Sequence, residues 1–197
     1  QVRNPDGITS AMGITIADSG VINYINKFGQ LNNNNYKDND PASELYYAAM
    51  RYFRGLTNVA AYTSNNDGNN NLRARWADNF PVITTWQDPI QYSCQKNVIL
   101  GIGDVNTWND KNLPGATNTS NEPTKPPEII ADTAIDAVRA TQTIFNLEGI
   151  GTSASAENFT GRNNSAYIAG LAYLANTQAV PPQLAGQQTI STFWVDV

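Results

Sequence analysis

The stretch from Cys94 to Asp110, which reads CQKNVILGIGDVNTWND, constrains the fold more than any other part of the chain. Its apolar run, Val98 to Ile102, is ended by Gly103 and Asp104. A short, continuous apolar run between turn residues is typical of a strand that is buried on both faces, as in a parallel sheet. In open α/β sheets, chemistry gathers beyond the carboxyl ends of the strands, which is where Asp104 stands.

The rest of the chain alternates helical periodicity with polar loops and returns to a strand. The order strand, helices, strand after residue 94 predicts a parallel connection in an α/β sheet. Apolar residues at helical spacing, with capping residues before them and glycine or proline after them, mark the helices. The predicted helices are Gly20–Phe28, Pro41–Arg54, Glu128–Asn146 and Ser165–Asn176, and the further strand-like runs are Phe80–Trp86 and Gln188–Val197.

Composition limits the classes of function. Hydrophobic residues make up 41% and charged residues 15% of the 197 residues, which indicates a globular chain. The net charge of -5 and a pI near 4.6 argue against nucleic acid or an anionic membrane as the main partner. No run of about 18 apolar residues predicts a transmembrane segment. Because the chain contains no His, catalytic Ser-His and Cys-His pairs are excluded, and a metal site would need oxygen ligands.

The one cysteine, Cys94, leaves two interpretations open. An unpaired cysteine in a secreted chain indicates a disulfide to a segment outside the chain, whereas a small buried thiol is the structural alternative. The chain begins at Gln1, without Met and without a signal peptide. We therefore expect it to be an excised or mature piece of a longer protein.

Several long strings of the chain are distinctive. They are SGVINYINKFG at 19–29, DPASELYY at 40–47, DPIQYSCQKN at 88–97, GIGDVNTW at 101–108, KNLPG at 111–115, AGLAY at 169–173 and FWVDV at 193–197. Together these strings resemble the PilY/PilC family of type IV pilus-tip proteins. The resemblance covers nearly the whole chain and fails mainly in the Asn-rich loops.

The resemblance implies an internal piece of a large exported protein that sits at the pilus tip, the cell surface or the outer membrane. Family members have an N-terminal region similar to a von Willebrand factor A domain and a C-terminal β-propeller. The implied fold of residues 1–197 is a single, incomplete, Rossmann-like α/β domain with a mostly parallel sheet, flanking helices and long loops. The implied roles are pilus assembly, adhesion, twitching motility and surface sensing. The implied partners are minor pilins, a protein or glycan receptor, and the rest of the parent chain.

The resemblance also implies a divalent cation, Ca²⁺ or Mg²⁺, held by oxygens from three loops. Asp104 matches the Asp that follows the central strand, and Asp40 stands before Pro41 where the family pattern has a Thr. The first loop, Asp-x-Ser-x-Ser, has no convincing match and is expected upstream, since Asp18 is better explained as a helix cap. The structural alternatives are that Asp104 caps its own loop and that Asp40 caps the helix that follows it.

Three hypotheses of function follow. The first is a non-enzymatic binding and assembly module, with Asn106, Thr107 and Trp108 as partner contacts in the loop after the strand. The second is a structural spacer of the pilus tip that has no ligand of its own. The third is a glycan hydrolase that uses the pair Asp104 and Asp110 or the pair Asp132 and Asp136. Since such pairs arise by chance, we expect a non-enzymatic protein and assign no catalytic residue.

Overall fold

The computed structural model describes residues 40–64, 84–103, 107–117, 120–151, 164–180 and 186–196. The predicted helix Gly20–Phe28 lies outside these residues, as do Asp104, Asn106 and most of the run Phe80–Trp86. The chain divides into two compact units, residues 1–38 with 61–86 and residues 39–60 with 87–197. A short helix, α3 (Ala60–Thr63), lies where the chain passes from the second unit to the first. The elements that follow all belong to the second unit.

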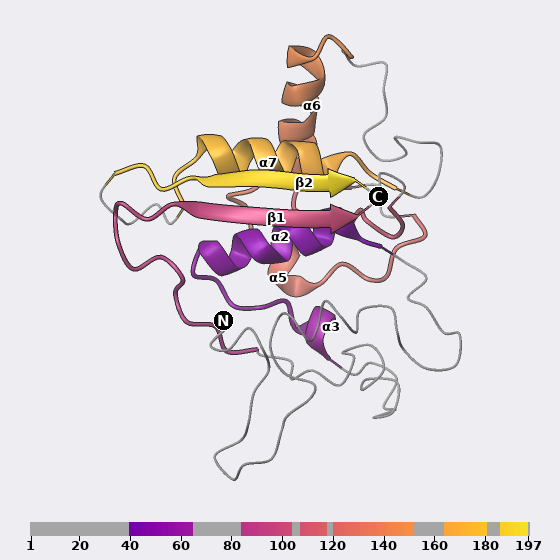
Figure 1. Ribbon diagram of the computed structural model, residues 1–197. Coiled ribbons are helices and arrows are strands. Elements are labelled where there is room, and N and C mark those ends of the chain that lie inside the picture. The colour runs from indigo at the N-terminus through magenta and orange to yellow at the C-terminus, as the bar shows by residue number, and fades with distance from the viewer. Residues whose placement is uncertain are drawn as a thin grey trace. The chain divides into compact units, whose positions relative to one another are not determined.

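The centre of this unit is a parallel pair of strands, β1 (Asn97–Gly103) and β2 (Ile190–Asp196). Their register runs from Asn97 opposite Ile190 to Gly103 opposite Asp196. Between the strands, the described residues form three helices, α5 (Pro127–Ile130), α6 (Ala137–Leu147) and α7 (Tyr167–Thr177). The predicted α/β class, the two strands and their parallel direction are therefore confirmed (Figure 1).

The helices that contact the sheet cover one of its faces. Helix α2 (Ala42–Phe53) packs on β1, and α7 packs on β2 (Figure 1). Ile99 and the fully buried Ile190 point into this core, and the Tyr46 hydroxyl lies 2.6 Å from the Thr192 hydroxyl. The other face is exposed, including Leu100 of β1. The prediction that β1 is buried on both faces is therefore wrong for the structure as it stands.

Most of the buried apolar side chains of the core come from α2 and α7. In α2, Tyr46, Tyr47 and Met50 are buried, and the apolar positions recur at helical spacing. In α7, Tyr167 and Leu171 are fully buried and face the same cluster. Loop residues also contribute to this cluster, among them Leu113, Ala116, Ile135 and Val180. None of the helices in the described part of the chain is long and apolar enough to cross a membrane.

The predicted helix Glu128–Asn146 is two helices, α5 and α6, with a break between them. The Asp132 carboxylate lies in the break and accepts hydrogen bonds from Tyr47 and Arg54. Asp136 then caps α6 by accepting a hydrogen bond of 2.9 Å from the Arg139 N–H group. Since Asp side chains that bond elsewhere compete with helical backbone geometry, two of them four residues apart end one helix and begin another.

Helices α6 and α7 approach closely at Gly170. A Cβ atom placed there would overlap the backbone nitrogen of Thr141 and lie 2.5 Å from its hydroxyl and 2.9 Å from the Ala137 carbonyl oxygen. The Thr141 side chain is itself fixed by a 2.7 Å hydrogen bond to that carbonyl. Glycine is therefore required for the contact between the two helices.

We expect Gly170→Ala to lower the free energy of unfolding by about 1–3 kcal/mol, because the added methyl group forces the helices apart. Chemical denaturation followed by circular dichroism measures this. Asn176→Ala, at an exposed position of the same helix, is the control and is expected to change stability by no more than about 0.5 kcal/mol. Equal stability of the Gly170 variant and the native chain would contradict this close packing.

Candidate binding site

A buried carboxylate, Asp110, joins three segments that are far apart in the sequence. It accepts hydrogen bonds from the Ser43 hydroxyl at 2.6 Å and from the Thr107 hydroxyl at 3.1 Å. The Ser165 hydroxyl lies 3.2 Å from the carboxylate and donates to the Asp110 carbonyl oxygen at 2.9 Å. Asp110 is completely buried, so these bonds stand in place of water.

Asp110 also caps helix α2 from outside the helix. Its Oδ1 atom accepts from the backbone N–H groups of Ser43 at 2.7 Å and Glu44 at 3.1 Å. Pro41, the residue before the helix, makes no side-chain cap bond, and the backbone carbonyl of Asp40 accepts from Ala42. The prediction that the Asp40 side chain caps this helix is therefore corrected, since a distant carboxylate meets the free N–H groups.

Burial raises the pKa of Asp110 to about 6, while the hydrogen bonds from Ser43, Glu44 and Thr107 oppose the shift. Desolvation disfavours the charged carboxylate more than these donors and the helix N-terminus favour it. The group therefore changes its charge in the pH range between 5 and 7.

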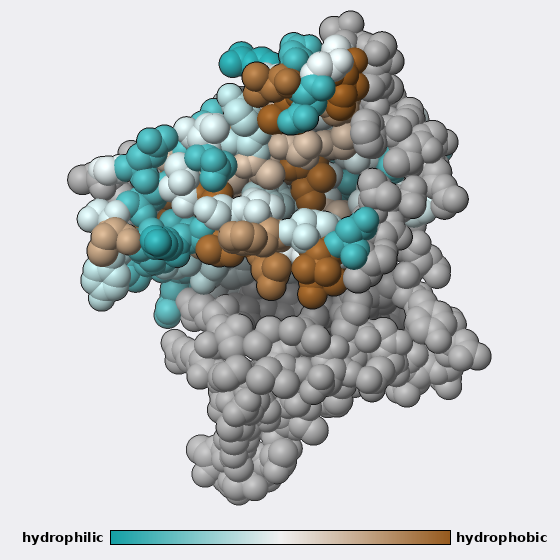
Figure 2. All heavy atoms as spheres, turned by 45° about the horizontal axis from the view of Figure 1, so that its top comes forward, coloured by the Kyte–Doolittle hydropathy of each residue, from teal (hydrophilic) through white to brown (hydrophobic). Residues whose placement is uncertain are grey.

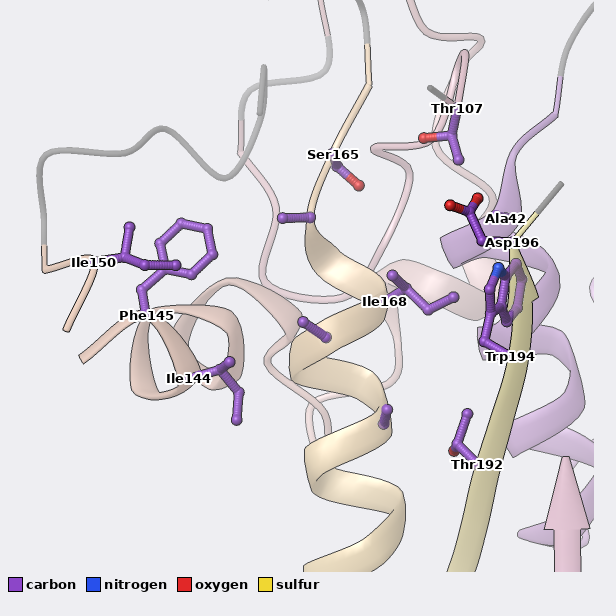
Figure 3. Close-up of a pocket in the computed structure, with 13 residues that line it drawn as sticks. Ala42, Thr107, Ile144, Phe145, Ile150, Ser165, Ile168, Thr192, Trp194 and Asp196 are labelled. Atoms are coloured by element: carbon purple, nitrogen blue, oxygen red, sulfur yellow. The ribbon is translucent and has the colours of Figure 1, made fainter. Parts of the chain in front are cut away.

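An apolar pocket of about 510 Å³ lies beside this cluster, between α6, α7 and the end of β2. Ile144 and Phe145 of α6, together with Ile150, form one wall, and Ile168 of α7 and Trp194 of β2 form the opposite wall (Figure 3). The volume fits one large side chain or a small organic group.

The indole of Trp194 can lie against the sheet beside the pocket because its partner on β1 is a glycine, Gly101. The indole ring lies across Gly101, where a Cβ atom would overlap the ring, and its Nε1 atom donates to the Gly103 carbonyl oxygen at 3.3 Å. The residue as a whole remains 36% exposed. The ring is thus held flat against the sheet with one surface open to the pocket.

Three polar side chains of the pocket lie toward one end, whereas Thr192 lines the other end. The hydroxyls of Thr107 and Ser165 and the carboxylate of Asp196 lie near one another, away from Ile144 and Phe145 (Figure 3). Both hydroxyls are also bonded to Asp110, so the buried cluster supports the polar end of the pocket. An apolar chamber with a carboxylate at one end suits an apolar group that carries a positive charge.

The structure describes four of the six residues predicted for sites. Thr107 is buried, lines the pocket and bonds Asp110, whereas Trp108 is half-buried. Cys94 is a free, exposed thiol, which corrects the alternative of a small buried thiol. Asp40 is exposed, and Asp104 and Asn106 lie outside the described residues.

Sequence reasoning missed Ser43, Ser165 and Trp194, and it considered Asp110 only as half of an acid pair. The one local signal is the Ser43-Glu44 pair that follows Pro41, which indicates N–H groups that need a cap. Nothing local shows which distant carboxylate meets them.

The described residues do not assemble a metal centre. In this part of the chain, no three Asp, Glu or Cys side chains lie close enough together to hold an ion. The Asp110 carboxylate accepts from N–H and O–H donors on both oxygens, so its lone pairs are occupied. The cation expected at Asp104 and Asp40 stays a prediction.

The acid pairs considered for a hydrolase have structural roles where the structure describes them. Asp132 forms an ion pair with Arg54 and accepts a hydrogen bond from Tyr47. Burial by itself would raise the pKa of Asp132, but these partners outweigh it, so the pKa is lowered. Asp136 caps α6, and Asp110 caps α2. Each of these carboxylates thus satisfies backbone or side-chain donors of the fold.

Comparison with known proteins places the chain. A family model described as "PilY1 homolog, second domain" matches residues 10–186. The chain belongs to this family. It is 52% identical over 200 residues to the type IV pilus biogenesis factor PilY1 homolog of Xylella fastidiosa (strain Temecula1). The match covers 96% of this chain and 16% of that relative, and no solved structure matches the chain. The predicted resemblance, to an internal piece of a PilY-type protein, is confirmed.

We expect the stability of the chain to rise relative to that of Asp110→Asn as the pH falls from 7.5 to 5. Because the folded-state pKa of about 6 lies above the ordinary carboxyl value of 3.8, the folded state binds a proton here that the unfolded state does not. The gain is about 1.4 kcal/mol over this range. Guanidinium unfolding of both proteins at the two pH values measures it. The Asn oxygen can still accept from the Ser43 and Glu44 backbone N–H groups, and its two N–H bonds can donate to two of the three hydroxyls. The variant therefore keeps most of the network and removes the titration. Parallel pH dependence of the two proteins would contradict the raised pKa.

Proposed function

We propose that this chain is a non-enzymatic, exported module of the type IV pilus tip that acts in pilus assembly, adhesion, twitching motility and surface sensing. The observation that carries the proposal is its 52% identity, over almost its whole length, to a type IV pilus biogenesis factor. Because the chain spans 16% of that relative, the activity of the whole protein comes to this piece only as part of the proposal.

The pocket is the proposed contact of this module with a pilus component, such as a minor pilin. Its walls would receive one apolar side chain, and Asp196 at its polar end would pair with a neighbouring Lys or Arg of the partner. The net charge of -5 favours approach of a cationic segment. A preformed pocket with an exposed indole resembles the anchor sites that carry most of the affinity in protein interfaces.

The von Willebrand factor A-like architecture belongs to the same proposal. The parallel strands, the helices that connect them and the loop after β1 are compatible with it. A receptor of protein or glycan type, and a C-terminal propeller elsewhere in the parent chain, complete the proposed assembly. The structural spacer differs from this proposal only in having no ligand at the pocket.

We expect Ile168→Glu to weaken binding of the purified chain to pilus-tip minor pilins by at least about tenfold, since it places a carboxylate between the apolar walls. The binding is measured by pull-down and by surface plasmon resonance. Leu45→Glu is the matched control, because Leu45 is 70% exposed on α2 and does not line the pocket. Circular dichroism confirms that both variants fold.

The same two variants, placed in the full-length protein, extend the test to cells. Loss of surface pili and of twitching with Ile168→Glu, but not with Leu45→Glu, supports the pocket as the contact. Equal binding and equal piliation of all three proteins would reject the pocket and favour the spacer.

A divalent cation at Asp104 and Asp40 is the remaining part of the proposal. After treatment with chelator, calorimetric titration of the chain with Ca²⁺ or Mg²⁺ is expected to show heat that Asp104→Ala removes and Asp40→Ala reduces. Heat that persists in Asp104→Ala, or no heat in the native chain, would remove metal from the proposal and leave metal-independent contacts.

A further inference from the structure

The sheet of this unit has one bare, strongly apolar face. The register places Val98, Leu100 and Ile102 of β1 beside Ser191, Phe193 and Val195 of β2. The five apolar members of this face are between 49% and 65% exposed. We call these five residues, Val98, Leu100, Ile102, Phe193 and Val195, the open face.

The open face is the reverse of the face that α2 and α7 cover. Side chains alternate along a strand, so Ile99 and Ile190 point to the helices while their neighbours point away. Figure 2 shows hydrophobic side chains gathered in a row along the described surface. Such a contiguous apolar patch on a folded unit marks an interaction surface.

The chemistry of the face indicates what covers it. Parallel sheets occur almost only with both faces packed against helices, because each crossover lays a helix on the sheet. The uninterrupted apolar run Val98–Ile102 is the sequence pattern of a strand covered on both sides. Only one of its sides is covered by the described helices, so the sequence provides for a partner that this unit does not supply.

We propose that the open face is the docking site of an amphipathic helix from another part of the same polypeptide, outside these 197 residues. The match covers 16% of the relative's length, so most of that relative's polypeptide lies outside the part that this chain matches. A helix of the same polypeptide also meets the face at high effective concentration, without the entropy cost of bimolecular association.

Cys94 stands at the edge of this face. It lies three positions before Asn97, where β1 begins. Its exposed thiol borders a hollow that Val98 and Phe193 also line. The disulfide to an outside segment that the sequence predicts would therefore hold the docked helix at the amino end of the strands.

Photo-cross-linking in the full-length polypeptide tests the docking. The photoreactive residue p-benzoylphenylalanine replaces Leu100 or Phe193 in separate variants, and cross-linked peptides are identified by mass spectrometry. We expect both positions to attach to one segment of the same molecule outside residues 1–197, at sites three or four residues apart. Replacement of Leu147, which is 69% exposed on α6, is the control and is expected not to attach to that segment.

The other outcomes overturn the proposal. Cross-links between two copies, seen as a dimer after denaturation, identify a second copy as the occupant, and cross-links to residues 1–38 or 61–86 identify the other unit of this chain. Cross-linked sites at alternate residues identify a strand, and absence of cross-links shows an open surface.

Maleimide labelling of Leu100→Cys and Leu147→Cys, in a Cys94→Ser background, provides a second measurement. Labelling at position 100 is expected to be at least about tenfold slower, with urea removing the difference, and equal rates in buffer would reject a docked helix.

Discussion

The carboxylate of Asp110 is the interaction on which the arrangement of this unit depends. Helix α2 begins with free N–H groups at Ser43 and Glu44, and a buried helix end without partners is costly. Asp110 meets both groups and also binds the Ser43 and Thr107 hydroxyls, with Ser165 beside it. One side chain thus fixes α2, the loop after β1 and the start of α7 relative to one another.

This arrangement has a cost that is relevant to function. Holding a carboxylate without water raises its pKa to about 6, so its charge is maintained by five donor contacts rather than by solvent. Two of those donors, Thr107 and Ser165, also line the apolar pocket. The polar end of the pocket is therefore preorganised by a network that is part of the fold, which favours selective binding over catalysis by a solvated acid.

The two faces of the sheet differ, because helices cover one of them and the other is exposed. On the inner face, α2 and α7 bury Ile99 and Ile190 and form the core. On the open face, apolar residues of both strands remain exposed. Together with membership of the PilY1 homolog family as its second domain, this asymmetry fits a unit that is completed by neighbouring parts of a much longer protein.

The sequence by itself determined the class of the fold and the family. Apolar spacing located α2 and α7, and apolar runs between turn residues located β1 and β2, because both signals are local to the segment. It failed at Asp132 and Asp136, where the tertiary partners Arg54 and Tyr47 and the cap of α6 divide one predicted helix into two. It also assigned the cap of α2 to the neighbouring Asp40. Only the tertiary structure decided that Asp110 caps this helix and that Trp194 lines a pocket, because both depend on residues at least 66 positions apart in the chain and no local pattern encodes such pairings.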